Sequence, residues 1–157
     1  MTQEWKKDKE DINILFNELF SAWSHGDGRA FANCFTEDVD YITFFGQHLK
    51  GREEVENSHQ DLFNGVLKGS QMQGRITSIR FLNADLAIVH CIGNTKMPSQ
   101  KNYSEKRASI NTNVLVKQNG EWKITSFHNC RIKEPNFLIN WFMKKGKKVE
   151  GKSKFGD

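Results

Sequence analysis

The sequence predicts an α+β domain, because helical patterns come first and strand patterns follow. In residues 12–23, apolar side chains recur at intervals of three and four, which is the stripe of an amphipathic helix. Residues 76–132 contain four segments with strand patterns, and Asn119-Gly120 between the last two is typical of a tight β-hairpin. Helices followed by antiparallel strands favour a fold in which the helices cover one face of a curved sheet.

Three helices are expected before the sheet. The first carries the apolar stripe and ends at Gly26, and Asp27 can cap a short second helix. The apolar residues of that second helix are Phe31, Cys34 and Phe35. The third runs from about Gly51 to about Val66, with two glutamates in its first turn, where the helix dipole favours negative charge.

Five strands are expected. Residues 38–46 are rich in β-branched and aromatic side chains and form a strand between the second and third helices. The other four strands are expected at residues 76–82, 86–95, 107–117 and 122–132. The first two of these are joined at Asn83-Ala84-Asp85 and the last two at Asn119-Gly120.

The length of 157 residues suits one domain and a tail. We place the domain at residues 1–132, and we expect a short helix after Pro135 and then a basic end within residues 133–157. The apolar side chains of that helix, which we expect to dock on its own or a partner subunit, are Phe137, Leu138, Trp141 and Phe142.

The formal charge of +4 lies entirely in the tail. Residues 1–132 hold 16 Lys and Arg against 16 Asp and Glu, whereas residues 133–157 hold seven lysines against three acids. A nucleic-acid binding surface needs a basic face on the fold itself, so we expect no nucleic-acid partner.

Cysteine usage and hydropathy indicate a cytoplasmic protein. Cys34, Cys91 and Cys130 are odd in number and far apart, so we expect reduced core residues rather than disulfides or a zinc site. The N-terminus lacks the apolar segment of a signal peptide, and no run of about 18 apolar residues occurs, so no membrane span is expected.

A series of short motifs spans residues 12–132. They are Phe45-Gly46, Gly51-Arg52, His59, Leu62-Phe63-Asn64-Gly65, Lys68-Gly69-Ser70, Arg80-Phe81-Leu82, Ala87-Ile88-Val89-His90, Gly120-Glu121-Trp122-Lys123-Ile124 and Phe127-His128-Asn129. In order and spacing they resemble the nuclear transport factor 2-like superfamily, in particular the SnoaL-like group and its SgcJ/EcaC-type branch. The resemblance implies a cystatin-like cone, in which a strongly bent antiparallel sheet wraps around helices, with a pocket at the open end and usually a homodimer through the sheet.

The same resemblance leaves the activity open, because members include ketosteroid isomerases, dehydratases, polyketide cyclases and epoxide hydrolases. Isomerisation of the ketosteroid type needs a carboxylate base on the first strand and a phenol on the first helix. The matching positions hold Thr43 and Leu19, neither of which can perform that step. Asp40 or Asp38 would supply a base if the register of the first strand differs.

His59 and His128 are the candidates for proton transfer, because an imidazole can donate or accept a proton near neutral pH. His59 lies on the apolar face of the third helix. Its alternative role is a buried histidine bonded to a backbone carbonyl or a tyrosine. His128 shares a strand face with Trp122, opposite the face of Phe127, and a β-bulge near Thr125 would exchange the two faces.

Two further strand faces leave alternatives open. Arg107, Ser109, Asn111 and Asn113 share one face, which is either a solvated outer face, a polar dimer contact or a polar cavity wall. Leu86, Ile88, His90 and Ile92 share another, which we expect to form a two-fold dimer contact because it is too apolar to face water.

The expected ligand is a small apolar molecule with one or two hydrogen-bonding groups. Its apolar wall is predicted from Phe16, Phe20, Trp23, Phe35, Tyr41, Phe45, Phe63 and Trp122, and its polar contacts from His59, Asp40, Asn113 and His128. We expect Trp23 and Trp122 to be mostly buried. Since the sequence has no phosphate loop, no G-x-G-x-x-G turn and no metal-ligand spacing, neither a cofactor nor a metal is expected.

Two functions remain open from the sequence. One is a homodimeric pocket protein, with or without cofactor-free proton transfer in a dehydration, cyclisation or isomerisation. The other is an assembly module like the association domain of calcium/calmodulin-dependent kinase. A deep pocket with perturbed histidines favours the first, and a filled cone with a broad apolar sheet face favours the second.

Overall fold

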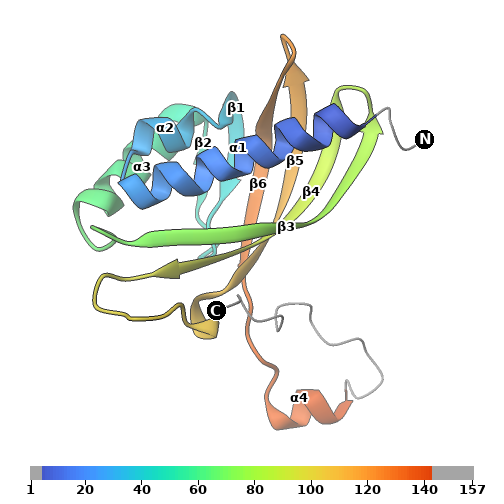
Figure 1. Ribbon diagram of the computed structural model, residues 1–157. Helices are drawn as coiled ribbons and strands as arrows, with labels where there is room; N and C mark the ends of the chain where they lie inside the picture. The colour runs from blue at the N-terminus through green and yellow to red at the C-terminus, as the bar shows by residue number, and fades with distance from the viewer. Residues whose placement is uncertain (1–4, 143–157) are drawn as a thin grey trace.

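The computed structural model describes residues 5–142, in which three helices pack into the concave face of a six-stranded sheet (Figure 1). The helices of the body are α1 (Lys6–His25), α2 (Gly28–Ala32), α3 (Arg52–Asn64) and the short 3-10 helix η1 (Glu105–Arg107). The strands are β1 (Phe35–Ile42), β2 (His48–Lys50), β3 (Gln71–Asn83), β4 (Leu86–Lys96), β5 (Ser109–Gln118) and β6 (Glu121–Arg131). A last helix, α4 (Phe137–Phe142), follows the sheet. The predicted α+β architecture is confirmed.

The strand order is β2-β1-β6-β5-β4-β3. Neighbouring strands are antiparallel except β1 and β6, which run parallel. These two strands are far apart in the sequence, so no hairpin turn constrains their direction. The short β2 was not predicted, since three residues are too few to show a pattern.

The first two helices begin and end where local chemistry requires. Gly26 closes α1 in the left-handed conformation, with φ of 66°, and its N–H caps the last turn. Asp27 then caps α2 by accepting a hydrogen bond from the Ala30 N–H at 2.9 Å. The α2 helix ends at Ala32, earlier than expected, and Phe35 opens β1 instead of continuing the helix.

The hairpin between β5 and β6 follows the sequence prediction. Asn119 and Gly120 have φ of 52° and 83°, so both central residues adopt the positive φ of a type I′ turn.

A β-bulge in β6 decides which side chains face the helices. Leu115 pairs with Ile124 but Val114 pairs with Ser126, so Thr125 is the extra residue. Trp122 and Ile124 therefore point inward before the bulge, and Phe127 does so after it. The bulge also turns Cys130 outward. The prediction that all three cysteines are core residues was wrong for Cys130, whereas Cys34 and Cys91 are buried.

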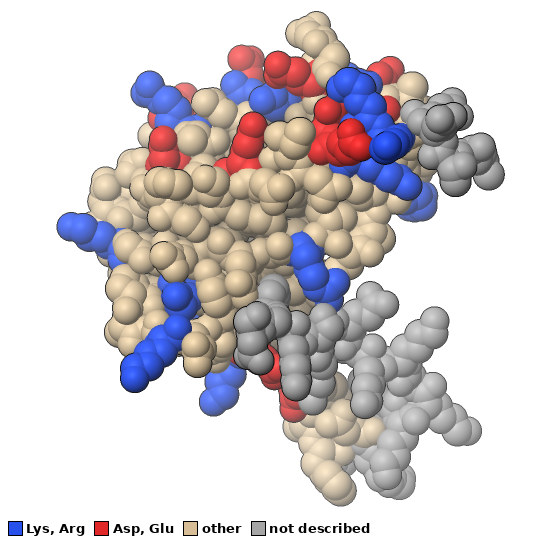
Figure 2. All heavy atoms as spheres, viewed as in Figure 1, with Lys and Arg blue, Asp and Glu red and all other residues tan. Residues whose placement is uncertain are grey.

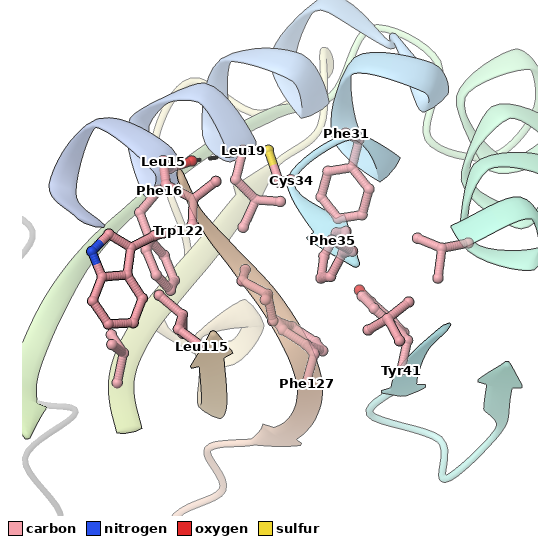
Figure 3. Packing of buried hydrophobic residues seen from close by; sticks show 14 of the residues in the cluster. Leu15, Phe16, Leu19, Phe31, Cys34, Phe35, Tyr41, Leu115, Trp122 and Phe127 are labelled. Atoms are coloured by element: carbon pink, nitrogen blue, oxygen red, sulfur yellow. Dashed lines mark hydrogen bonds between the residues drawn. The ribbon is translucent and has the colours of Figure 1, made fainter. Parts of the chain in front are cut away.

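Trp122 lies in the core at the end remote from Tyr41 (Figure 3). Its ring is 4% exposed, and its Nε1–H donates to Asp8 Oδ1 at 2.9 Å. Lys117 completes the group with an ion pair to Asp8 at 2.8 Å. These hydrogen bonds hold the pKa of Asp8 below its usual value, against the opposing effect of burial.

The tail helix α4 stands apart from the body (Figure 1). Phe137 is 84% exposed and Ile139 is 47% exposed, so neither side chain docks on its own subunit. The side chains of Leu138, Trp141 and Phe142 lie outside the described part of the chain. Of the helices in residues 5–142, none is long and apolar enough to cross a membrane.

Candidate functional site

A cavity of about 330 Å³ lies between α1, α3 and the inner face of the sheet. One wall is apolar and largely aromatic and comes mainly from α1, which contributes Phe16, Leu19, Phe20 and Trp23. Gly93 of β4 lies in the opposite wall. A Cβ atom added at Gly93 would have no atom within 4 Å, so this position faces open space. The size and lining are those of a small-molecule pocket.

The first residues of strand β5 form a polar part of the wall. Ser109 and Asn111 line the cavity, so the interpretation of this face as a polar cavity wall is the one that the structure supports. Asn113 is fully buried one step deeper, where its Nδ2 donates to Asn111 Oδ1 at 2.6 Å and to the Val89 carbonyl at 3.2 Å. Asn113 thus occupies the Asn111 oxygen, and in the part of the chain that the structure describes the Asn111 amide N–H groups have no hydrogen-bond partner.

Asn129 of β6 adds an acceptor to this wall. Its Oδ1 is buried and, within residues 5–142, has no hydrogen-bond partner. A buried unpaired carbonyl oxygen costs free energy, and a ligand donor would reach this atom only if the side chains that cover it moved.

Tyr41 and His59 form a hydrogen-bonded pair inside the cavity. His59 Nδ1 lies 2.8 Å from the Val55 carbonyl and Nε2 lies 3.2 Å from Tyr41 Oη. Since a carbonyl only accepts, Nδ1 carries the proton and Nε2 accepts from the Tyr41 hydroxyl. The Tyr41 oxygen keeps its lone pairs for a ligand donor.

Burial sets the protonation of this pair. Desolvation lowers the pKa of His59 to about 4, although the hydrogen bond to the Val55 carbonyl opposes the shift. Desolvation also raises the pKa of Tyr41. Both groups are therefore neutral near pH 7. The sequence alternative for His59, a buried imidazole bonded to a carbonyl and a tyrosine, describes its contacts, yet the ring also lines the cavity.

His128 and Asp40 lie on the other face of the sheet. In the β1 and β6 pairing, Tyr41 lies opposite Phe127 on the inner face, while Ile42 lies opposite His128 on the outer face. His128 is exposed. Asp40 is also exposed and pairs with His48 at 2.7 Å. The structure thus brings neither residue to His59, because the bulge at Thr125 fixes His128 outward.

The predicted apolar wall divides into two groups. The residues that do line the cavity are Phe16, Phe20, Trp23, Tyr41 and Phe45. Phe45 is 81% exposed at the mouth, and Trp23 is only half-buried because it borders the cavity. The residues that pack elsewhere in the core are Phe35, Phe63 and Trp122.

The rings of Phe35 and Phe63 contact Phe31, which itself lines the cavity and was not assigned to it from the sequence. Figure 3 shows Phe31 and Phe35 side by side. Phe127 and Arg131 also line the cavity and were not assigned to it from the sequence. The bulge in β6 is the feature that turns them inward. Thr43 and Leu19 line the cavity, so no carboxylate or phenol stands at the two positions that ketosteroid isomerisation uses.

A wider hollow of about 600 Å³ lies outside α1 and α2 but is a shallow, solvent-open surface lined by residues such as Asn17 and His25. In the described chain, no group of three His, Cys, Asp or Glu side chains is placed to hold a metal ion.

Comparison with known proteins gives consistent matches. A family model described as a SnoaL-like domain matches residues 12–130. A solved domain of unknown function with a cystatin-like fold, from Nostoc punctiforme, is 32% identical, with 89% of this chain and 85% of that chain covered and a TM-score of 0.78. No protein among those with curated descriptions matches.

Two more distant structures share the fold. A provisionally assigned scytalone dehydratase from Novosphingobium aromaticivorans is 14% identical, with 87% of this chain and 92% of that chain covered and a TM-score of 0.69. A provisionally assigned calcium/calmodulin-dependent protein kinase type II association domain from Thiobacillus denitrificans is 15% identical, with 76% and 93% covered and a TM-score of 0.66. At these identities the likeness shows the fold alone.

Proposed function

Because the chain belongs to the SnoaL-like domain family, we propose that it binds a small, largely apolar molecule in the cavity of its cystatin-like cone. The observation that carries this proposal is the cavity itself, of about 330 Å³, with an aromatic wall on one side and amide groups on the other. Enclosed apolar space with a few converging polar groups is the usual form of a ligand site. A cone that served only for assembly would gain stability by filling this space.

Tyr41 is the group best placed to recognise a ligand oxygen. Its hydroxyl donates to His59, so its oxygen accepts a hydrogen bond from a ligand hydroxyl, and the three groups form a chain along which a proton can move. This is the cofactor-free chemistry that dehydration, cyclisation and isomerisation need. With a pKa of about 4, however, His59 is a weak base at neutral pH, so the geometry favours binding and polarisation over complete proton transfer.

A titration with N-phenyl-1-naphthylamine, an uncharged dye whose fluorescence rises in apolar surroundings, tests the pocket. We expect saturable binding by the wild-type protein. The Gly93→Leu variant should bind the dye at least about 10-fold more weakly, because its side chain fills open cavity space. The Gly93→Ala variant is the matched control and should retain most of the binding, since a methyl group fills little of the cavity.

Equal binding by wild type and Gly93→Leu, with both proteins folded by circular dichroism, would place the dye outside the cavity and contradict the proposal. So would an absence of saturable binding by the wild type.

We also propose a homodimer through the outer face of the sheet. The outward side chains of β4 and β5 form an apolar surface that is only half-buried in one subunit, made of Leu86, Ile88, Ile110, Val114 and Val116. Ile92, which was expected on this surface, is only 2% exposed within one subunit and therefore adds little apolar area to the dimer contact. His90, which bonds Ser78 at 3.1 Å, lies within this surface.

Sedimentation equilibrium at micromolar protein should therefore give the mass of a dimer, and Ile88→Glu should give a monomer because it places a charge in the contact. A monomer mass for the wild type would exclude this dimer. An assembly larger than a dimer that binds no dye would instead favour the association-module function, for which the broad apolar sheet face is the supporting observation.

A further inference from the structure

Two arginines border the cavity and, among the described residues, have no acidic partner. Arg107, at the end of η1, and Arg131, at the end of β6, both contribute to the lining. The lining residues that the structure describes include no Asp or Glu. None of the ion pairs within residues 5–142 involves either arginine. Within residues 5–142, this end of an otherwise neutral cavity therefore carries two positive charges that no acidic side chain pairs.

Arg131 is held in one orientation. Its Nη1–H donates to the Arg107 carbonyl at 2.6 Å, and its guanidinium lies 4.4 Å from the centre of the Phe44 ring. The ring contact is a cation–π interaction, which leaves the outer edge of the guanidinium available for hydrogen bonds. Burial and the charge of Arg107 both lower the pKa of Arg131, so the two cations disfavour each other. An anion between them would remove this cost.

Among the polar residues beside the two arginines, Ser109 and Asn111 are donors, whereas Asn129 presents an acceptor oxygen. Ser109 follows Arg107 by two residues, and its hydroxyl faces the cavity beside the Asn111 amide, whose N–H groups are free of protein partners in the described chain. Arginine guanidinium groups match the planar, two-oxygen geometry of a carboxylate.

The surface charge agrees with this arrangement. On the face shown in Figure 2, acidic side chains stand among Lys and Arg along the upper edge, over the helices, whereas the lower part of the body shows mainly Lys and Arg. The segment that carries η1 lies in this lower part (Figure 1).

We propose that the ligand is an apolar, ring-bearing carboxylic acid in its ionised form, with its carboxylate bound by Arg107 and Arg131 and its rings packed against Phe16, Phe20 and Trp23. This inference rests on the proposed function and adds the charge and orientation of the ligand. Neutral molecules of the same shape bind the apolar wall but leave the two arginines uncompensated.

Competition against N-phenyl-1-naphthylamine tests the inference with two probes of one shape, 2-naphthoate and its uncharged amide, 2-naphthamide. We expect 2-naphthoate to displace the dye from wild-type protein at a concentration roughly 10- to 100-fold lower than 2-naphthamide, since hydrogen bonds to charged groups contribute this much. The preference should shrink with added salt, which screens the partly exposed charges.

The Arg107→Gln/Arg131→Gln double variant should lose the preference for 2-naphthoate and keep its affinity for the dye. Arg29→Gln is the control for each single variant, because it removes one positive charge from an α2 side chain that is 80% exposed and outside the cavity. Should the double variant not fold, each single variant is expected to lose part of the preference, and the wild-type comparison stands without any variant.

Equal displacement by the acid and the amide, with the dye still bound, would overturn the carboxylate inference and leave the pocket proposal intact. A preference for the acid that the arginine variants retain would overturn it as well. If the dye itself does not bind, the proposed function fails, and the inference fails with it.

Discussion

Replacement of Trp122 by alanine should lower the free energy of unfolding by about 3–5 kcal/mol, the usual cost of deleting a large buried aromatic side chain. The ring is 4% exposed and packs near Phe81, with centroids 5.9 Å apart. Its loss also leaves Asp8 without the Nε1–H donor at 2.9 Å, while Lys117 keeps its ion pair to the same carboxylate. The variant therefore leaves a cavity in the core and removes one of the hydrogen bonds to the Asp8 carboxylate.

Urea denaturation of wild type and variant measures this change. Trp122→Phe serves as the control, because it keeps most of the apolar volume and removes only the hydrogen bond, which costs about 1–2 kcal/mol. A loss under about 1 kcal/mol for Trp122→Ala would mean that β6 presents its other face to the helices.

Acidification should destabilise the protein through His59. The folded state holds the pKa of this imidazole at about 4, below its ordinary value of 6.5, because burial disfavours the charged ring. Between these two values the unfolded chain binds more protons than the folded one, so stability falls as the pH falls. The stabilisation is complete above the unfolded pKa and amounts to about 3 kcal/mol by the usual conversion of pKa differences.

Denaturation of wild type and His59→Gln at about pH 7 and about pH 4.5 isolates this contribution, since glutamine does not titrate. The wild type should lose more stability than the variant over that interval. Asp8 acts in the same direction, but its usual pKa of 3.8 places its effect at lower pH. Equal losses in the two proteins would show that His59 is accessible to water in the folded state.

The parts of the fold that depend only on residues close together in the sequence were predictable. The stripe of α1 needs only a period of three and four residues, and the β5–β6 turn needs only Asn119 and Gly120. The end of α2 was misplaced because Cys34 and Phe35 continue an apolar pattern that suits a helix and a strand equally.

The candidate site was harder to predict, since it depends on which face of β6 points inward. Strict alternation cannot reveal a bulge, and the one at Thr125 exchanges the roles of His128 and Phe127.

The proximity of Arg107 and Arg131 could not be predicted for a different reason. Arg107 and Arg131 lie 24 residues apart and meet through the pairing of β5 with β6, which places Ser109 opposite Arg131. No local pattern in the sequence reports such a contact.

The proposed function depends most on whether Tyr41 and His59 border a ligand site. The most direct measurement is ¹⁵N NMR of the imidazole nitrogens of the five histidines during titration with N-phenyl-1-naphthylamine. We predict that the His59 signals, which report a neutral ring protonated at Nδ1, move as the dye saturates the cavity. The signals of the exposed His25 and His128 should stay in place. Unchanged His59 signals at dye concentrations that saturate the fluorescence would contradict a ligand site beside Tyr41 and His59.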